Sequence, residues 1–101
     1  MLVYTVSVRF PNEGLRDEFV AWLEDGHLAD VVAAGAESGE VIVPDGDQLV
    51  VDAVYRFSSR EAFAAYVEGP AVALRASGSS TFADRGAVFT RSTGLSRYQY
   101  P

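Results

Sequence analysis

Two stretches of alternating residues constrain the fold of this chain more than any other feature. In residues 2–10 and 48–57 every second side chain is apolar, which is the period of a β-strand with one face in a hydrophobic core. The apolar positions are Leu2, Tyr4, Val6, Val8 and Phe10 in the first stretch and Leu49, Val51, Ala53, Tyr55 and Phe57 in the second. The opposite faces mix valines with hydroxyl and charged side chains. We therefore expect a sheet with one fully covered face and one half-apolar face.

The segments that follow the first stretch carry helix and turn signals. Asn12 is suited to cap a helix that begins near Glu13, and Gly35 is suited to end that helix. Residues 44–47 contain a proline and a glycine and are typical of a hairpin turn, so residues 40–43 are expected to form a strand paired with the next one.

The second half of the chain predicts a second, broken helix and a last strand. Residues 58–61 match a capping box in which Ser58 caps the helix and Glu61 reaches back. The helix is expected to break at residues 69–70, a glycine and a proline, and the last β-prone stretch is residues 82–93.

The resulting order is β-α-β-β-α-β, which is the order of the ferredoxin-like α+β fold. We therefore expect one domain over residues 1–93, built as a four-stranded antiparallel sheet with its helices on one face, and a C-terminal tail over residues 94–101. The half-apolar face would then lack a cover, and symmetric pairing of two copies through this face is the common solution. The alternative is that a small domain simply tolerates a mixed outer face.

Composition narrows the classes of function. The net charge is -6, and basic residues gather nowhere along the chain, so we expect neither nucleic acid nor a membrane surface as partner. No apolar stretch approaches the length of a membrane span. Cysteine and lysine are both absent, which excludes disulfides, thiolate chemistry and Schiff bases, and is compatible with a cytoplasmic location. We expect no metal site and no cofactor, because the single histidine has no second ligand at a metal-binding spacing.

The only tryptophan, Trp22, and the only histidine, His27, lie five residues apart in the first helix. At helical spacing Trp22 falls within the apolar stripe that covers the sheet, and the stripe changes phase after Gly26. We therefore expect a kink at Gly26, with Trp22 in the core and His27 hydrogen-bonded to the carbonyls that the kink frees. The alternative is that His27 is a general base at the mouth of a pocket, with Trp22 beside a ligand.

The half-apolar face supplies further candidates for ligand binding. Arg9, Asp52 and Arg56 are expected to line the space between two paired sheets, either as ligand contacts or as an ion-pair cluster of the interface. Two functions remain open. The first is a non-catalytic dimeric domain that binds a small molecule or supports a partner. The second is a cofactor-independent monooxygenase or isomerase that acts on an aromatic or polyketide-like compound, with His27 as proton acceptor and Trp22 or Tyr55 beside it.

A spaced set of residues resembles a known family. The set comprises Tyr4-Thr5-Val6, Trp22-Leu23, His27, Gly35, Tyr55-Arg56-Phe57, Phe63, Tyr66, Pro70-Ala71 and Leu74-Arg75. It resembles a small bacterial domain family of unknown function within the dimeric α+β barrel superfamily, over nearly all of the chain to about Arg91. In that family a proline typically follows the histidine by two positions, whereas this chain has Ala29 there.

The resemblance implies a ferredoxin-like fold whose open sheet face packs against a twofold mate. The superfamily includes cofactor-independent monooxygenases, haem-handling enzymes and proteins that only bind or regulate, so the fold does not choose among them. A haem enzyme would need His27 as axial ligand, and the sequence offers no set of residues for the opposite side of the haem. No catalytic residue is carried over from the family.

Overall fold

The computed structural model describes the backbone of residues 1–101 and every side chain except that of residue 77. The strands are β1 (Leu2–Arg9), β2 (Ser38–Ile42), β3 (Val50–Phe57) and β4 (Val88–Leu95). The first helical layer contains α1 (Glu13–Trp22), the π-helical segment η1 (Leu23–His27) and α2 (Leu28–Ala33). The second layer contains α3 (Arg60–Glu68), α4 (Pro70–Leu74), the π-helical segment η2 (Arg75–Ser79) and α5 (Ser80–Asp84).

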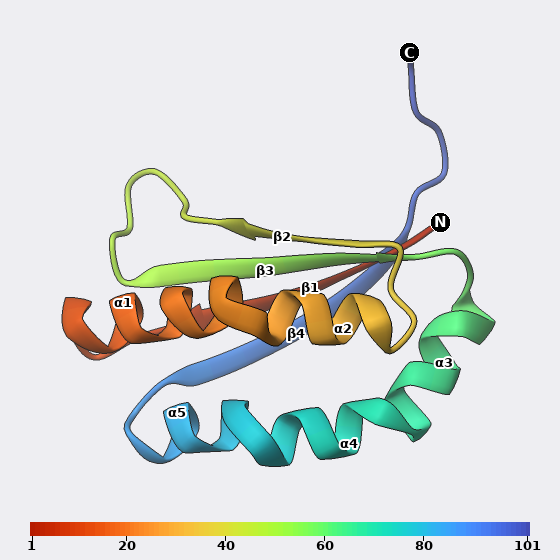
Figure 1. The fold of residues 1–101 in the computed structure, drawn as a ribbon. Helices are drawn as coiled ribbons and strands as arrows, with labels where there is room; N and C mark the ends of the chain where they lie inside the picture. The colour runs from red at the N-terminus through yellow and green to blue at the C-terminus, as the bar shows by residue number, and fades with distance from the viewer.

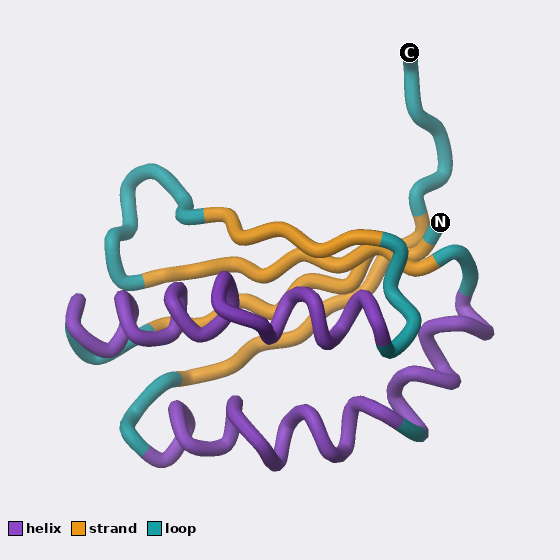
Figure 2. The backbone as a smooth tube through the Cα atoms, viewed as in Figure 1, coloured by secondary structure: helices purple, strands orange, loops and turns teal.

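The strands form one antiparallel sheet in the order β2-β3-β1-β4. Both helical layers lie on the same side of this sheet, and no element of the chain covers the other side (Figures 1 and 2). The predicted ferredoxin-like fold, with four antiparallel strands and helices on one face, is confirmed.

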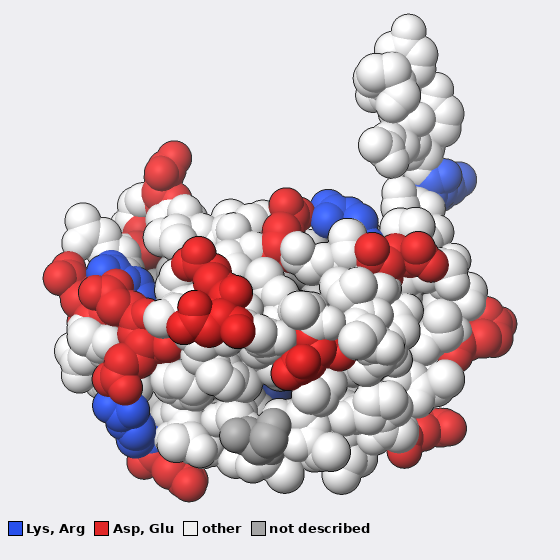
Figure 3. Space-filling view, in the orientation of Figure 1, with Lys and Arg blue, Asp and Glu red and all other residues white. Residues whose placement is uncertain are grey.

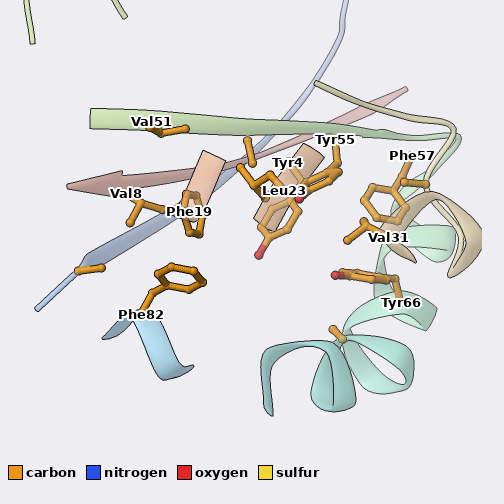
Figure 4. Packing of buried hydrophobic residues seen from close by; sticks show 14 of the residues in the cluster. Tyr4, Val8, Phe19, Leu23, Val31, Val51, Tyr55, Phe57, Tyr66 and Phe82 are labelled. Atoms are coloured by element: carbon orange, nitrogen blue, oxygen red, sulfur yellow. The ribbon is translucent and has the colours of Figure 1, made fainter. Parts of the chain in front are cut away.

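The alternation in β1 and β3 explains which side is covered. Tyr4 of β1 lies opposite Tyr55 of β3, and Val8 lies opposite Val51, all on the helix side of the sheet. Their side chains are almost fully buried, as are those of Phe57 and the helical residues that meet them (Figure 4). Each fully buried side chain of this size stabilises the fold by about 1.5–3 kcal/mol, so the helix-sheet interface is the main source of stability.

One of the two predicted helix caps is present in the structure, and the other lies one residue later than predicted. Asn12 caps α1, its side chain accepting a hydrogen bond of 2.8 Å from the amide of Leu15. The cap of α3 is Ser59, which accepts from the amide of Ala62 at 3.1 Å. The prediction that Ser58 caps this helix is wrong by one residue, because the strand runs on to Phe57 and leaves Ser58 in the bend before the helix.

The largest difference between sequence and structure lies in residues 82–87, which are not a strand. Phe82 belongs to α5, where its ring packs edge-on against Phe19 with 5.1 Å between centroids. Burial of this ring keeps the chain helical through a segment of small residues, and Gly86, at a φ of 104° that favours glycine, then turns it into β4. The last strand therefore starts at Val88.

The C-terminal tail begins slightly later than predicted. β4 continues through Leu95, so residues 94 and 95 belong to the sheet, and the amide of Ser96 still donates to the carbonyl of Met1 at 2.9 Å. Beyond that point the chain leaves the sheet as an extended arm (Figure 1). In the described part of the chain, no helix is long and apolar enough to cross a membrane.

Candidate functional site

The break in the first helical layer brings Trp22 and His27 together. At Gly26 the backbone leaves helical geometry, with φ 166° and ψ -25°, and residues 23–27 form a π-helical segment between α1 and α2. The predicted kink is confirmed. The two rings stack almost in parallel, with 3.9 Å between their centroids and 19° between their planes.

The predicted hydrogen bond from His27 to freed carbonyls is not among the interactions of the described residues. The ring rests on Trp22 instead. The kink at Gly26 turns His27 away from the position that it would have on a continuous helix.

Trp22 is fixed in place from several sides. Its ring lies 5.6 Å from that of Phe19 and 5.4 Å from that of Phe82. Gly78 of η2 lies so close to the indole that an added Cβ would overlap the ring. Trp22 is therefore a bridge between the two helical layers as well as the platform on which His27 stacks.

A cavity opens beside this stack, between the helices and the sheet. Its atom-free space is about 410 Å³, which includes some open solvent, and the part that admits the centre of a water-sized sphere is about 30 Å³. Its lining includes aromatic and basic side chains from the helices and the sheet, namely Tyr4, Phe19, Trp22, His27, Tyr55, Tyr66, Arg75 and Arg91. As it stands the cavity has room for about one or two water molecules, so a larger ligand has to displace side chains at its mouth.

Three tyrosines give the cavity its hydrogen-bonding groups. Figure 4 shows the hydroxyl groups of Tyr4 and Tyr66 directed into the space between the sheet and α4, and the side chain of Tyr55 lies next to Tyr4. No hydrogen bond among the described residues engages these hydroxyls. Burial raises the pKa of Tyr55 and of Tyr66, so both phenols keep their protons at neutral pH and can donate them to a ligand.

Burial also determines the state of His27. The low-polarity surroundings lower the pKa of its imidazole, and the nearby carboxylate of Asp30 opposes this shift only partly. His27 is therefore neutral at pH 7, and a neutral imidazole has a nitrogen lone pair free to accept a proton.

The other predicted ligand residues lie on the far side of the sheet. Arg9, Asp52 and Arg56 alternate with the core-facing residues of β1 and β3, so they share the open face. The structure does not bring these three together. Arg9 pairs with Asp47 at 2.6 Å and Arg56 pairs with Glu40 at 3.0 Å.

Asp52 differs from its two arginine neighbours. Its Oδ1 atom is buried, and no group among the described residues donates to it. A buried carboxylate oxygen without a donor is costly within a single chain, so this atom is a feature of the open face that favours a further partner.

Most of the tyrosines and arginines that line the cavity are not among the site residues predicted from the sequence. Tyr4 and Tyr55 were placed on the core face, but Tyr66, Arg75 and Arg91 were not expected to meet them. A signal for Arg91 exists, because the alternation of β4 places this charged residue on the same face as Phe89. The described residues contain no group of three or more potential metal ligands.

Comparison with known proteins supports the fold. No protein-family model matches the chain, and no curated protein matches its sequence. A dimeric ferredoxin-like protein from an uncultured marine organism is similar in structure, with a TM-score of 0.73 and 17% identity over 98% of this chain and 97% of that one.

Two characterised proteins are also similar in structure. SnoaB, a cofactor-independent oxygenase from Streptomyces nogalater, has a TM-score of 0.70 and 10% identity over 99% of this chain and 96% of its own. The haem degrader MhuD from Mycobacterium tuberculosis, solved with two haems in its active site, has a TM-score of 0.66 and 20% identity over 98% of this chain and 100% of its own. At these identities the likeness shows the fold alone, which this chain shares with ferredoxin-like proteins that are described as dimeric.

Proposed function

We propose that the protein is a homodimer that binds a small aromatic molecule in the cavity of each subunit. The observation that carries this proposal is the Trp22–His27 stack in the wall of a cavity that also holds unpartnered tyrosine hydroxyls. Aromatic walls with a few convergent polar groups are typical of small-molecule sites. A flat ring can lie against the existing stack while the phenols of Tyr4 and Tyr66 donate to its substituents.

The size of the cavity limits the ligand. Only about 30 Å³ is open to a water-sized sphere, so a compound of one or two rings is the largest that small side-chain movements can admit. A haem would displace the cavity wall on both sides. We therefore do not propose that this chain binds haem as MhuD does. The expected ligand is a mono- or bicyclic aromatic compound.

Calorimetric titration tests this binding directly. We expect 2-naphthol to bind the unmodified protein, and Ala53→Leu to abolish binding because Ala53 forms part of the cavity floor. Ala21→Leu makes the same change on the exposed side of α1 and should leave binding intact. Binding that survives Ala53→Leu in a folded protein would place the ligand elsewhere.

The uncovered face of the sheet supports the homodimer. Val88 is 62% exposed there, and Val3, Val50 and Val54 share that face with charged and hydroxyl residues. A second copy would cover Val88 and the partly exposed Val3 and Val50, and would offer donors to the buried oxygen of Asp52, whereas Val54 is already buried in the single chain. The marine protein of similar fold is also described as dimeric.

Light scattering measures the assembly. The expected mass is twice the 10.9 kDa of the chain. Val54→Arg should shift the protein to monomer by burying unpaired charge between the sheets, whereas Val72→Arg on exposed α4 should not. A monomer at all concentrations in the unmodified protein would exclude this part of the proposal.

A second candidate is a cofactor-independent oxygenase or isomerase in which His27 removes a proton from the bound aromatic compound. The neutral state of His27 inside the cavity favours it, because only the neutral imidazole can act as a base. The test is oxygen uptake with a panel of aromatic quinols, measured above the rate in buffer. His27→Gln should lower kcat by about 100-fold or more. An unchanged rate would remove His27 from the reaction, and an absence of uptake with all quinols would leave the binding function alone.

A further inference from the structure

Two arginines stand at the entrance of the cavity. Arg75 begins η2, and Arg91 lies in the middle of β4. Both line the central cavity, and both also line two shallow surface hollows beside it, with atom-free spaces of about 770 and 540 Å³. All three hollows are therefore lined by these two side chains, which lie where the central cavity borders the surface.

Neither arginine has an acidic partner among the described residues. By contrast Arg9, Arg16, Arg56 and Arg85 each pair with a carboxylate at 2.6–3.0 Å. The guanidinium of Arg91 lies over the ring of Phe89, 5.2 Å from its centroid. Among the described residues Arg60 and Arg97 also have no carboxylate partner, but they do not line the cavity. In a chain of net charge -6, whose surface is dotted with acidic side chains (Figure 3), Arg75 and Arg91 are the two arginines without a carboxylate that border the same cavity.

The positive field of this pair reaches into the cavity. Burial raises the pKa of the Tyr66 phenol, and Arg75 and Arg91 both act in the opposite direction, as cations near a hydroxyl do. The hydroxyl of Tyr66 points into the space between the sheet and α4 (Figure 4). The two guanidinium groups and this phenol therefore converge on one region.

We propose that Arg75 and Arg91 form an anion clamp that selects aromatic compounds carrying a carboxylate. The proposal rests on the aromatic-binding function above and adds the chemical class of the ligand. The ring of the ligand would lie inward, towards Trp22 and His27, and the carboxylate outward, where the planar guanidinium groups can each donate hydrogen bonds to its oxygens.

The clamp also accounts for how a ligand enters so narrow a cavity. Two like charges at one entrance repel each other, and a carboxylate between them removes that repulsion. When the two arginine side chains move to the carboxylate, they change the width of the opening that they line.

The test compares 2-naphthoate with 2-naphthamide, its neutral counterpart of nearly the same shape, by calorimetric titration of the unmodified protein. We expect the carboxylate to bind about tenfold tighter or more, since hydrogen bonds to charged groups are stronger than neutral ones. Raising the salt concentration should weaken the binding of the carboxylate and leave that of the amide nearly unchanged.

Variants assign the preference to the two side chains. Arg75→Gln and Arg91→Gln should each reduce the preference for the carboxylate, and the double variant should abolish it. Arg97→Gln, which removes one positive charge from the exposed tail, should preserve it. Both cavity arginines are exposed, so thermal melting should confirm that the variants fold.

The outcomes separate this proposal from the one on which it rests. Equal affinity for the two compounds in the unmodified protein, or a preference that survives in the double variant, overturns the clamp and leaves aromatic binding standing. If neither compound nor 2-naphthol binds, the aromatic-binding function fails and the clamp fails with it.

Discussion

The arginines of the open sheet face and those of the cavity on the other side differ in their pairing. On the open face Arg9 and Arg56 are each paired with a carboxylate of the same chain, at 2.6 and 3.0 Å. On the helix side Arg75 and Arg91 have no acidic partner among the described residues, and they border a cavity with aromatic walls. Paired charges on a surface contribute little and attract little, whereas unpaired charges next to a cavity are free to act on a ligand. The contrast supports the proposal that a ligand binds on the helix side and that two copies assemble through the open side.

The strongest test of this contrast is truncation on the helix side. Phe19→Ala removes a ring that is 1% exposed and contacts Phe10, Trp22, Phe82 and Phe89. We expect it to lower the free energy of unfolding by about 3–5 kcal/mol, measured by denaturant titration. Val72→Ala, at an exposed position of α4, should change it by less than about 0.5 kcal/mol. Similar losses in the two variants would mean that the helix-sheet interface is not the main core.

A smaller loss of stability is expected from adding a side-chain atom where the two helical layers touch each other. Gly78→Ala adds a Cβ that overlaps the indole of Trp22, and we expect a cost of about 1–3 kcal/mol in the free energy of unfolding. Trp22→Phe removes the overlapping part of the ring, so the double variant should lose less stability than the sum of the single variants. Additive losses would show that the two residues do not touch in solution.

The pH dependence of stability separates the cavity from the surface charges. Because the folded pKa of His27 is lowered, the unfolded chain binds a proton more readily, so stability falls as the pH drops below about 6.5. Glu18 and Asp47 also have lowered pKa values, but their contribution is lost in a more acidic range, below about 4.5.

Thermal melting between pH 7.5 and 5.5 measures the contribution of His27. The melting temperature of the unmodified protein should fall over this range, and that of His27→Gln should fall less. The same slope in both proteins would exclude a buried neutral histidine.

The smallest change in stability is expected from a substitution on the open face of the sheet. Arg56→Gln removes an exposed ion pair with Glu40, and the free energy of unfolding of the subunit should change by no more than about 1 kcal/mol. Denaturant titration of the monomeric Val54→Arg protein, with and without this change, isolates the subunit from the interface. A loss as large as that of Phe19→Ala would mean that the charged residues of the open face hold the fold together.

The covered face of the sheet can be predicted from the sequence, because the alternation of apolar residues lies within single strands. Alternation in β1 and β3 places Tyr4 and Tyr55 on the covered face, and the phase change at Gly26 places the kink before His27. The position of the kink does not reveal that the His27 ring stacks on Trp22, since that depends on how a π-helical segment turns two side chains.

The cavity is harder to predict because it is assembled from distant segments. Its entrance joins η2 and β4, and the sequence pattern predicts a strand from residue 82, where the structure has the helix α5 as far as Asp84. The secondary structure of that region depends on the burial of Phe82 in the tertiary structure and not on local propensity. The open-face candidates Arg9, Asp52 and Arg56 were correctly placed on one face, but their ion pairs run to Asp47 and Glu40, which the pattern of one strand does not specify.

The most direct measurement of the central claim uses the two rings that occur once each in the chain. With one tryptophan and one histidine, the indole N–H and the imidazole resonances in an NMR spectrum need no further assignment. On titration with 2-naphthoate we expect both to shift in step with saturation, because the ligand ring lies against the Trp22–His27 stack. If the compound binds by calorimetry while both resonances stay unchanged, the ligand does not occupy the cavity and the account is wrong.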